Sequence, residues 1–174
     1  MFPMTIRQAD PSDQNDINRI YACARALMKA DGNPNQRGDK KPYPDVLRFD
    51  IEKNRLYIVE NEGRAVGCFA FYEGPDPTYN YIENGSWSKD GPYHVIHRVA
   101  SDGSVKGVMN TILAFCFSKA SYLRMDTHDD NHRMQHILLS HGFRRCGTIY
   151  LEDGNKRISF DRVVLPSGQV TFDA

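Results

Sequence analysis

The order of strand-like and helix-like apolar spacing constrains the fold of this chain more than any single motif does. Alternating or continuous apolar runs predict strands, and apolar residues three and four apart predict amphipathic helices. These patterns predict the order β-α-α-β-β-β-α-β-α-β-β. The order predicts an α/β (α+β) fold, a single domain in which one mixed central sheet is flanked by helices. The expected strands are 4–9, 56–59, 65–72, 94–100, 123–127, 144–151 and 157–163.

Cap and turn residues predict where these elements begin and end. Ser12 is the expected N-cap of the first helix, because its hydroxyl can accept a free backbone N–H. Asp31-Gly32 is expected to end that helix, and Asp153-Gly154 predicts a tight hairpin turn. The further helices are expected at 44–51, 108–120 and 131–141. The polar segments 33–44 and 74–91 are predicted as long loops, which in compact domains are often functional.

Composition predicts an ordinary soluble protein and excludes some partners. The 174 residues, 40% hydrophobic and 25% charged, suit one domain over 1–165 followed by a tail at 166–174. Lys+Arg and Asp+Glu balance at 22 each, which gives no global reason to expect nucleic acid or an anionic membrane as partner. The chain lacks an apolar run of about 18 residues and an apolar signal segment. Its four scattered cysteines indicate reduced thiols in the cytoplasm, and a homodimer is compatible with all of this.

Histidines crowd the segment 124–143 and raise the hypothesis of a metal site. His128, His132 and His136 lie four residues apart, a spacing that places side chains on one helix face. On a helical wheel, however, His132 and His136 lie opposite the apolar stripe formed by Met134, Ile137 and Leu138. No acidic residue shares their face, and zinc needs three or four convergent ligands. We therefore expect a solvated helix face and no metal.

The same segment carries a resemblance to a known family. Asn131 is followed eleven residues later by Gly142-Phe143, with a predicted strand on either side. This pattern resembles the second half of the GNAT superfamily of N-acetyltransferases, and residues 94–100 resemble its central strand. Ser101 to Val108 resemble the turn that wraps the pyrophosphate of coenzyme A, although only Gly107 matches the usual motif strictly. The order of elements resembles that of the family over residues 4–163.

The turn at 101–108 has a physical reading of its own. Gly103 and Gly107 allow backbone to approach a ligand closely. The helix expected at 108 begins with N–H groups that lack intrahelical partners, and its dipole favours an anion there. Lys106 adds a positive charge beside them. The alternative is a glycine-rich turn without a ligand.

The resemblance implies acetyl-CoA as co-substrate and assigns residues to it. The pantetheine arm would pair with the central strand, and Asn131 would bond it or hold the strands apart. The N–H of Val99 would polarise the thioester carbonyl. The residues expected to hold the cofactor are Val99, Ala100, Ser101, Ser104, Val105, Lys106, Gly107, Val108 and Asn131.

Candidate catalytic and acceptor-binding residues follow from these positions. Alternation would place Val95, His97 and Val99 on one strand face, so that His97 could take a proton from the attacking amine, directly or through water. The alternative is that His97 is only packed or hydrogen-bonded within the sheet, and Glu83 is the weaker candidate base. The family's thiolate-protonating Tyr is replaced by Leu138, so that the acid is Tyr150 or a water, or else the thiolate leaves without an acid. The aromatic residues of the second loop are expected to bind the amine, or else to form a lid over the core: Tyr79, Tyr81 and Trp87.

Three functions are therefore open at this stage. The first is transfer of an acetyl group from acetyl-CoA to a primary amine of a small molecule or peptide. The second is a non-catalytic CoA-binding module, which the presence of Leu138 favours. The third is a metal-dependent hydrolase, which the orientation of the histidines disfavours.

Overall fold

A computed structural model of the chain describes residues 3–164. The expected tail at 166–174 lies outside the described residues. The strands are β1 (Thr5–Gln8), β2 (Leu56–Asn61), β3 (Arg64–Glu73), β4 (His94–Ser101), β5 (Tyr122–Thr127), β6 (Arg144–Tyr150) and β7 (Lys156–Val163). The helices are α1 (Gln14–Ala30), α2 (Pro44–Glu52), α3 (Val108–Lys119) and α4 (His132–Ser140), with short 3₁₀ turns η1 (Pro11–Asp13) and η2 (Pro77–Tyr79). The expected order of strands and helices is confirmed.

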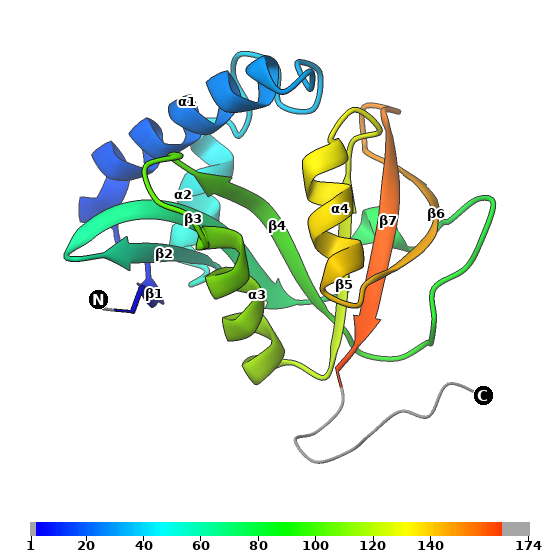
Figure 1. Ribbon diagram of the computed structural model, residues 1–174. Helices are drawn as coiled ribbons and strands as arrows, with labels where there is room; N and C mark the ends of the chain where they lie inside the picture. Colours follow the sequence, from blue (N-terminus) through cyan, green and yellow to red (C-terminus); the bar gives the residue numbers. More distant parts are fainter. Residues whose placement is uncertain (1–2, 165–174) are drawn as a thin grey trace.

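All strands join one mixed sheet, as expected. The sheet has seven strands in the order β1-β2-β3-β4-β5-β7-β6. Neighbouring strands are antiparallel except β4 and β5, which are parallel and connected through α3. Helices α1 and α2 cover one face of the sheet, over β2 to β4, while α3 and α4 lie on the other face (Figure 1). Within residues 3–164, no helix is long and apolar enough to cross a bilayer.

Two apolar cores hold the helices against the sheet. On one face, Ile17, Ile20 and Tyr21 of α1 pack with Ile58 and Cys68 of the sheet. On the other face, α3 and α4 pack against the opposite side chains of β2 to β7, with Ile112, Leu113, Leu138, Phe69 and Phe160 buried together.

The beginning of α1 differs from the expectation. Ser12 is not the N-cap. Asp10 caps η1 instead: its carboxylate accepts the N–H of Ser12, and the carboxylate of Asp13 accepts the N–H of Asp10. Asp is as good an N-cap as Ser, and Pro11 fits the first turn because it has no N–H to satisfy. The helical periodicity behind this cap is unaffected.

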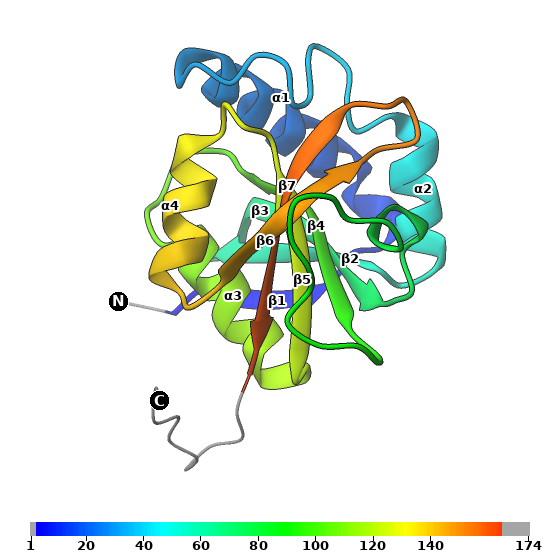
Figure 2. The same ribbon diagram turned by 90° about the vertical axis from the view of Figure 1, so that its right-hand side faces the viewer.

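The segment 74–93 forms a loop that covers the β5–β7–β6 side of the sheet (Figure 2). Glu83 forms a bridge with Thr148 of β6, and the Ser88 hydroxyl donates to Asp161 of β7. Beneath the loop, Tyr79, Tyr93 and Tyr122 form a third apolar cluster. The loop is therefore tied to the sheet by both hydrogen bonds and buried rings.

The sheet opens between β4 and β5. The two strands pair only where His94 faces Leu123 and Val95 faces Arg124, and β4 continues to Ser101 without further pairing to β5. Their carboxyl ends therefore diverge, with α3 and α4 on either side of the opening (Figure 1). In open sheets, ligands commonly bind at the carboxyl ends of two adjacent strands whose following connections lead away in different directions.

A bulge in β4 coincides with this opening. Ala70 pairs with His97 and Cys68 with Ala100, so two residues of β4 stand opposite one of β3. Arg98 has a positive φ of 53°, a conformation that a non-glycine residue adopts only when its surroundings fix it. The fixing contact is a two-bond ion pair, in which Arg98 donates to the buried carboxylate of Asp50 at 2.7 and 3.0 Å.

The bulge corrects one expectation about β4. His97 and Val99 do not share a face, because an extra residue in a strand reverses the alternation beyond it. His97 lies with Tyr79 under the 74–93 loop, whereas the side chain of Val99 packs against the core below α3 and α4.

We predict that Asp50→Ala lowers the free energy of unfolding by about 3 kcal/mol, because it leaves the guanidinium of Arg98 unpaired in a partly buried place. Urea titration followed by circular dichroism measures the change. Glu52→Ala, an exposed acid on the same helix, is the control and should change stability by less than about 0.5 kcal/mol. Equal effects of the two variants would contradict the role given to the Asp50–Arg98 pair.

Candidate active site

A cavity of about 500 Å³ lies where β4 and β5 diverge. Its wall comes from the end of α1, the loop before α2, β4, β5, the start of α4 and the β6–β7 turn. Of the residues proposed from the sequence, His97, Val99 and Asn131 line it. The cavity also holds charged groups that the sequence analysis did not select, above all Arg37, Asp76, Asp126 and Arg157.

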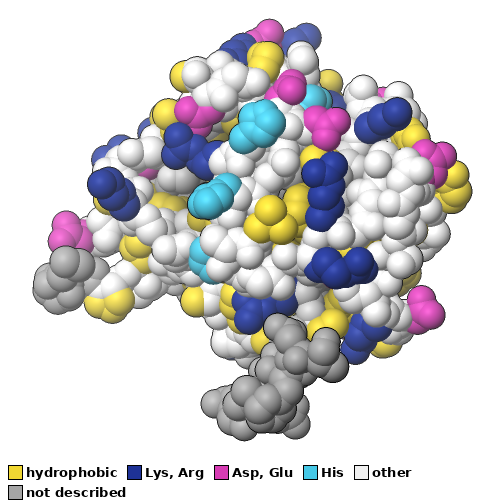
Figure 3. Space-filling view, turned by 45° about the vertical axis from the view of Figure 1, so that its right-hand side comes forward, with side chains coloured by type: hydrophobic (Ala, Val, Ile, Leu, Met, Phe, Trp, Pro, Cys, Tyr) yellow, Lys and Arg dark blue, Asp and Glu magenta, His cyan; other side chains and the backbone are white. Residues whose placement is uncertain are grey.

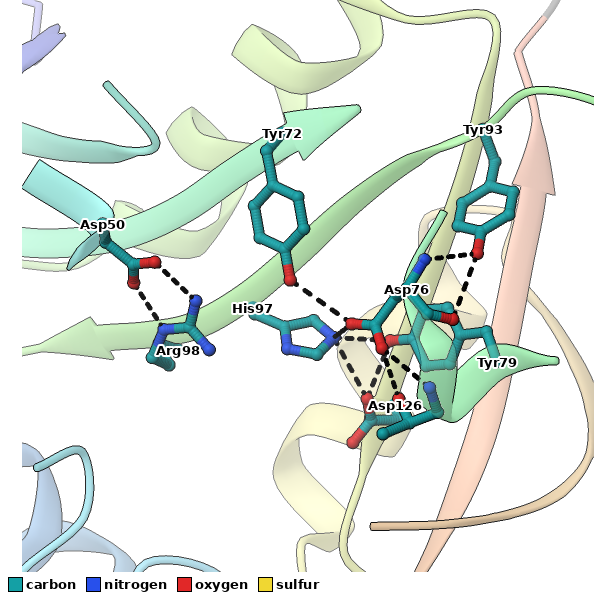
Figure 4. Close-up of polar contacts among 9 residues, drawn as sticks. Asp50, Tyr72, Asp76, Tyr79, Tyr93, His97, Arg98 and Asp126 are labelled. Carbon is teal, nitrogen blue, oxygen red and sulfur yellow. Dashed lines mark hydrogen bonds and ion pairs between the residues drawn. The ribbon is translucent and has the colours of Figure 1, made fainter. Parts of the chain in front are cut away.

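His97 is the centre of a polar cluster in this cavity (Figure 4). Its Nε2 lies 2.7 Å from the hydroxyl of Tyr79, 3.3 Å from a carboxylate oxygen of Asp126 and 3.7 Å from one of Asp76. The Tyr79 hydroxyl also donates to Asp126 at 2.7 Å. Asp76 is itself fixed, because its carboxylate accepts both the N–H and the hydroxyl of Thr78.

These contacts decide which nitrogen of His97 is free. The hydroxyl of Tyr79 has a single proton, which it donates to Asp126. Nε2 of His97 is therefore best satisfied as an N–H donor toward the Tyr79 hydroxyl oxygen and the Asp126 carboxylate oxygen. Neutral imidazole then carries its lone pair on Nδ1. Nδ1 has no hydrogen-bond partner within residues 3–164, and in Figure 4 no contact is drawn to it. Tyr79 and Asp126 therefore fix the tautomer of the imidazole, which leaves Nδ1 as the basic nitrogen.

The surroundings set the protonation states of this cluster. Burial lowers the pKa of His97 below its ordinary value, and the carboxylates of Asp126 and Asp76 act in the opposite direction. Burial, together with the charge of Asp126, raises the pKa of Tyr79 well above its ordinary value. At neutral pH the imidazole of His97 is therefore mostly neutral and the phenol of Tyr79 is protonated. These protonation states suit a general base that is held by the hydrogen-bonded Tyr79 and Asp126.

The turn after β4 leads into α3 through two glycines in the left-handed region. Gly103 has a φ of 80° and Gly107 one of 87°, which favours glycine at both positions. Gly107 is the residue before α3, and the first helical bond runs from Thr111 N–H to its carbonyl. Among the described residues, the N–H groups of residues 105–110 donate no hydrogen bond. A run of free amides at a helix N-terminus is a site for phosphate.

Ser104 has a different environment from that of residues 105–108. Its N–H and its hydroxyl both donate to the carboxylate of Asp102, at 2.9 and 2.6 Å. The same carboxylate accepts from Arg19 of α1 at 2.8 Å. The serine thus holds the turn in shape, and Arg19 neutralises the acid that would otherwise repel phosphate. Sequence reasoning overlooked Asp102, although an Asx turn before a glycine is a recognisable signal.

Asn131 caps α4 and joins it to the loop before α2. Its side-chain oxygen accepts the N–H of Met134 at 3.0 Å, and its amide nitrogen donates to the side-chain oxygen of Gln36 at 2.9 Å. Gln36 also accepts from Thr127 of β5 and from Asn33. The loop thus closes over the opening of the sheet. Gln36 was not expected from the sequence, since its partners lie far away along the chain.

The remaining candidates lie outside the cavity. Glu83 accepts from Tyr81 at 2.8 Å and from Tyr150, and these three form a cluster on the surface of the 74–93 loop and β6. Tyr81 is 61% exposed, whereas Tyr79 is 1% exposed and lies behind His97. Trp87 packs on the ring of Tyr79 and donates to its carbonyl. The predicted aromatic residues are therefore not gathered around one ligand.

The histidines of α4 have the orientation that the helical wheel predicts. His132 and His136 are exposed, while Leu138 is fully buried. On the surface shown in Figure 3, histidine side chains are spaced apart among lysines and arginines. Within the described residues there is no group of three His, Cys, Asp or Glu side chains that could hold a metal ion.

Comparison with solved structures identifies the architecture. A GNAT-family acetyltransferase of Streptococcus agalactiae matches with a TM-score of 0.84 and 28% identity, over 92% of this chain and 95% of that one. The chain therefore has the fold of GNAT-family acetyltransferases. An acetyltransferase structure from Staphylococcus aureus matches with a TM-score of 0.69 and 20% identity, over 92% and 99% of the two chains. Comparison with protein-family models and with curated proteins gave no match.

Coenzyme A is present in one of the solved structures that share this fold. That structure is the NatC complex bound to Gag peptide and CoA, which matches with a TM-score of 0.60 over 94% of this chain, at 13% identity. At that identity the likeness extends to the fold.

We predict that the pKa of His97 lies below the 6.5 of a free imidazole and that Asp126→Asn lowers it further. Removing a nearby negative charge disfavours the imidazolium, so the sign of the change is downward. Titration of the imidazole signals by NMR measures both values. Asp153→Asn, which removes a cavity carboxylate paired with Lys41, should leave His97 unchanged. A rise in the Asp126→Asn variant would show that Asp126 does not face His97.

Proposed function

We propose that this protein transfers the acetyl group of acetyl-CoA to a primary amine, on a small molecule or a peptide, by direct attack. The observation that carries the proposal is the position of His97. A fixed imidazole with a free Nδ1 lines a cavity at the opening of a GNAT sheet, and the strand that bears it ends in a turn of free amides. The similar protein from Streptococcus agalactiae is an acetyltransferase of the GNAT family, which supports the same type of reaction.

Acetyl-CoA would be held by the turn and by the open edge of β4. The N–H groups of Val105, Lys106, Gly107 and Val108 would bind the pyrophosphate, with Lys106 contributing charge from solvent. Beyond the last β4–β5 pair, the backbone of Val99, Ala100 and Ser101 would receive the pantetheine arm. Asn131 would line the other side of the opening. Ser104 would support the turn through Asp102.

The chemistry then requires one base and one polarising group. Nδ1 of His97 takes a proton from the acceptor amine, and the amine nitrogen attacks the thioester carbon. The N–H of Val99 stabilises the negative charge that develops on the carbonyl oxygen. The C–S bond breaks, the amide product forms, and the thiolate of CoA leaves. The proton on His97 passes to the thiolate or to solvent.

Tyr79 and Asp126 serve as positioning residues in this scheme. They keep the proton of His97 on Nε2, and the negative charge of Asp126 stabilises the imidazolium that forms after proton transfer. Glu83 and Tyr150 bond each other outside the cavity, which favours His97 as the base and leaves no side chain at Leu138 or Tyr150 to protonate the thiolate. A thiol with a pKa near 8.5 leaves without such help.

The alternative is a CoA-binding protein that does not catalyse transfer. The burial of Leu138 at the position of the family's usual Tyr favours this alternative. Release of free thiol from acetyl-CoA, measured over a panel of primary amines, separates the two functions. Transfer to any amine above the rate without amine supports the enzyme. CoA binding in calorimetry with no transfer over the panel supports the binding module.

We predict that His97→Ala lowers kcat/KM at least tenfold and leaves the Kd for CoA within about twofold of its original value, because Nδ1 acts on the amine and not on the cofactor. Thiol release and calorimetry measure the two quantities. His94→Gln is the control, since His94 lies on the same strand but stacks on Phe71 outside the cavity. Equal loss of turnover and CoA affinity would remove His97 from the role of base.

We predict that Gly107→Glu weakens CoA binding at least 100-fold, whereas Gly107→Ala weakens it much less. Both variants strain a backbone with positive φ by about 1 kcal/mol, but only glutamate adds negative charge and bulk beside the free amides. Calorimetry with CoA measures the difference. Similar affinities in the two variants would show that the pyrophosphate binds elsewhere.

A further inference from the structure

Arg37 is a charged group in the cavity that the proposed mechanism leaves unused. It lies in the loop before α2 and points into the opening of the sheet, where Nη2 donates to the carbonyl of Val99 at 2.5 Å. The centre of its guanidinium lies 5.3 Å from the centroid of the Tyr21 ring. Nη1 is buried and has no hydrogen-bond partner in the described part of the chain. A buried N–H donor without a partner is uncommon and calls for a reason.

The charge of Arg37 is also uncompensated. No carboxylate within residues 3–164 lies at ion-pair distance from it, in contrast to Arg98, which pairs with Asp50, and Arg19, which pairs with Asp102. Burial lowers the pKa of Arg37 below its ordinary value, and the positive charges of Arg25 and Arg98 act in the same direction. Arginine nevertheless stays protonated in proteins. The cavity thus contains a cation that lacks an anion.

Arg37 is held in this place by its neighbours. Arg157 is buried and donates to the carbonyl of Gln36 at 3.1 Å. The side chain of Gln36 is bonded to Asn131 and Thr127 on the far side of the opening. These contacts fix the backbone on which Arg37 stands, so its position is built into the fold.

The charges of the cavity are therefore separated. Asp76 and Asp126 stand around His97, where an ammonium group would be attracted before it loses a proton. Arg37 stands at Val99, two residues farther along β4 and on the other side of the bulge at Arg98. A small acceptor with an amine at one end and an anion at the other would match both groups. The planar fork of arginine suits a carboxylate, which it can bind through two parallel hydrogen bonds.

We infer that Arg37 binds the carboxylate of the acceptor, so that the enzyme selects amino acids over simple amines and over the N-termini of peptides. The inference rests on the proposed function and narrows its acceptor class. A short span between the two sites favours acceptors whose amine and carboxylate lie on the same carbon or on neighbouring ones. A peptide N-terminus has a neutral amide at that place, which offers a single carbonyl oxygen and no negative charge to the guanidinium.

The test compares acceptors that differ only in the carboxylate. Thiol release is measured with the common L-amino acids, their α-amides and the corresponding decarboxylated amines. For at least one side chain, kcat/KM should be at least tenfold higher for the free amino acid than for its amide or amine. Higher kcat/KM for the amides or the amines, or for phosphoethanolamine as a phosphate-bearing amine, would overturn the assignment of a carboxylate.

Variants of Arg37 link the preference to this residue. Arg37→Gln should lower kcat/KM for the preferred amino acid at least tenfold more than for its decarboxylated amine, chiefly through KM. Arg37→Lys should restore part of the preference, because it keeps the charge without the fork. Arg48→Gln, an exposed arginine of α2, is the control and should change neither. Equal losses for both acceptors in Arg37→Gln would mean that Arg37 only supports Val99.

Calorimetry separates failure of this inference from failure of the proposed function. The amino acids are titrated into the protein saturated with CoA. Amino-acid binding that depends on Arg37, without thiol release, would support the carboxylate site and overturn the proposed acetyltransferase activity. Thiol release without preference for a carboxylate would support the enzyme and overturn the site. Absence of both binding and release would overturn both.

Discussion

The separation of β4 from β5 is the constraint on which the rest of the structure depends. Parallel pairing ends after Val95 and Arg124, and from there β4 presents its edge to a cavity instead of to a neighbouring strand. Unpaired backbone groups are costly when buried and therefore need a partner. In this chain the loop before α2 supplies one such partner, since Arg37 donates a hydrogen bond to the carbonyl of Val99. A ligand that pairs like a strand would supply the remainder.

Buried charge makes this arrangement specific. The bulge at Arg98 reverses the alternation of β4, and the Asp50–Arg98 pair holds it. As a result His97 faces the cavity with carboxylates behind it, while Val99 turns its side chain into the opposite core. Breaking a buried ion pair leaves a charge without compensation. The same pair therefore links the stability of the fold to the geometry of the candidate base.

Much of the fold could be predicted from the sequence, because it depends on local patterns. Apolar periodicity gave the order of strands and helices, and the glycines at 103 and 107 indicated a tight turn before a helix. His97 was proposed from a strand alternation that the bulge interrupts and Asn131 from the family resemblance, and both residues line the cavity. The rest depends on contacts between residues far apart in the chain. The bulge, the Gln36–Asn131 bond, Asp126 behind His97 and the unpaired Arg37 follow from tertiary packing, which no periodicity reveals. The Asp10 cap was a local signal that was assigned to the wrong residue.

A crystal structure with acetyl-CoA tests the central claim most directly, because it shows where each end of the cofactor lies. The account predicts that the pyrophosphate contacts the N–H groups of residues 105–110. It further predicts that the thioester oxygen lies within hydrogen-bond distance of the Val99 N–H, with its carbon open to the Nδ1 side of His97. Density for the cofactor outside the opening between β4 and β5, or a thioester on the side of the sheet away from His97, would contradict it.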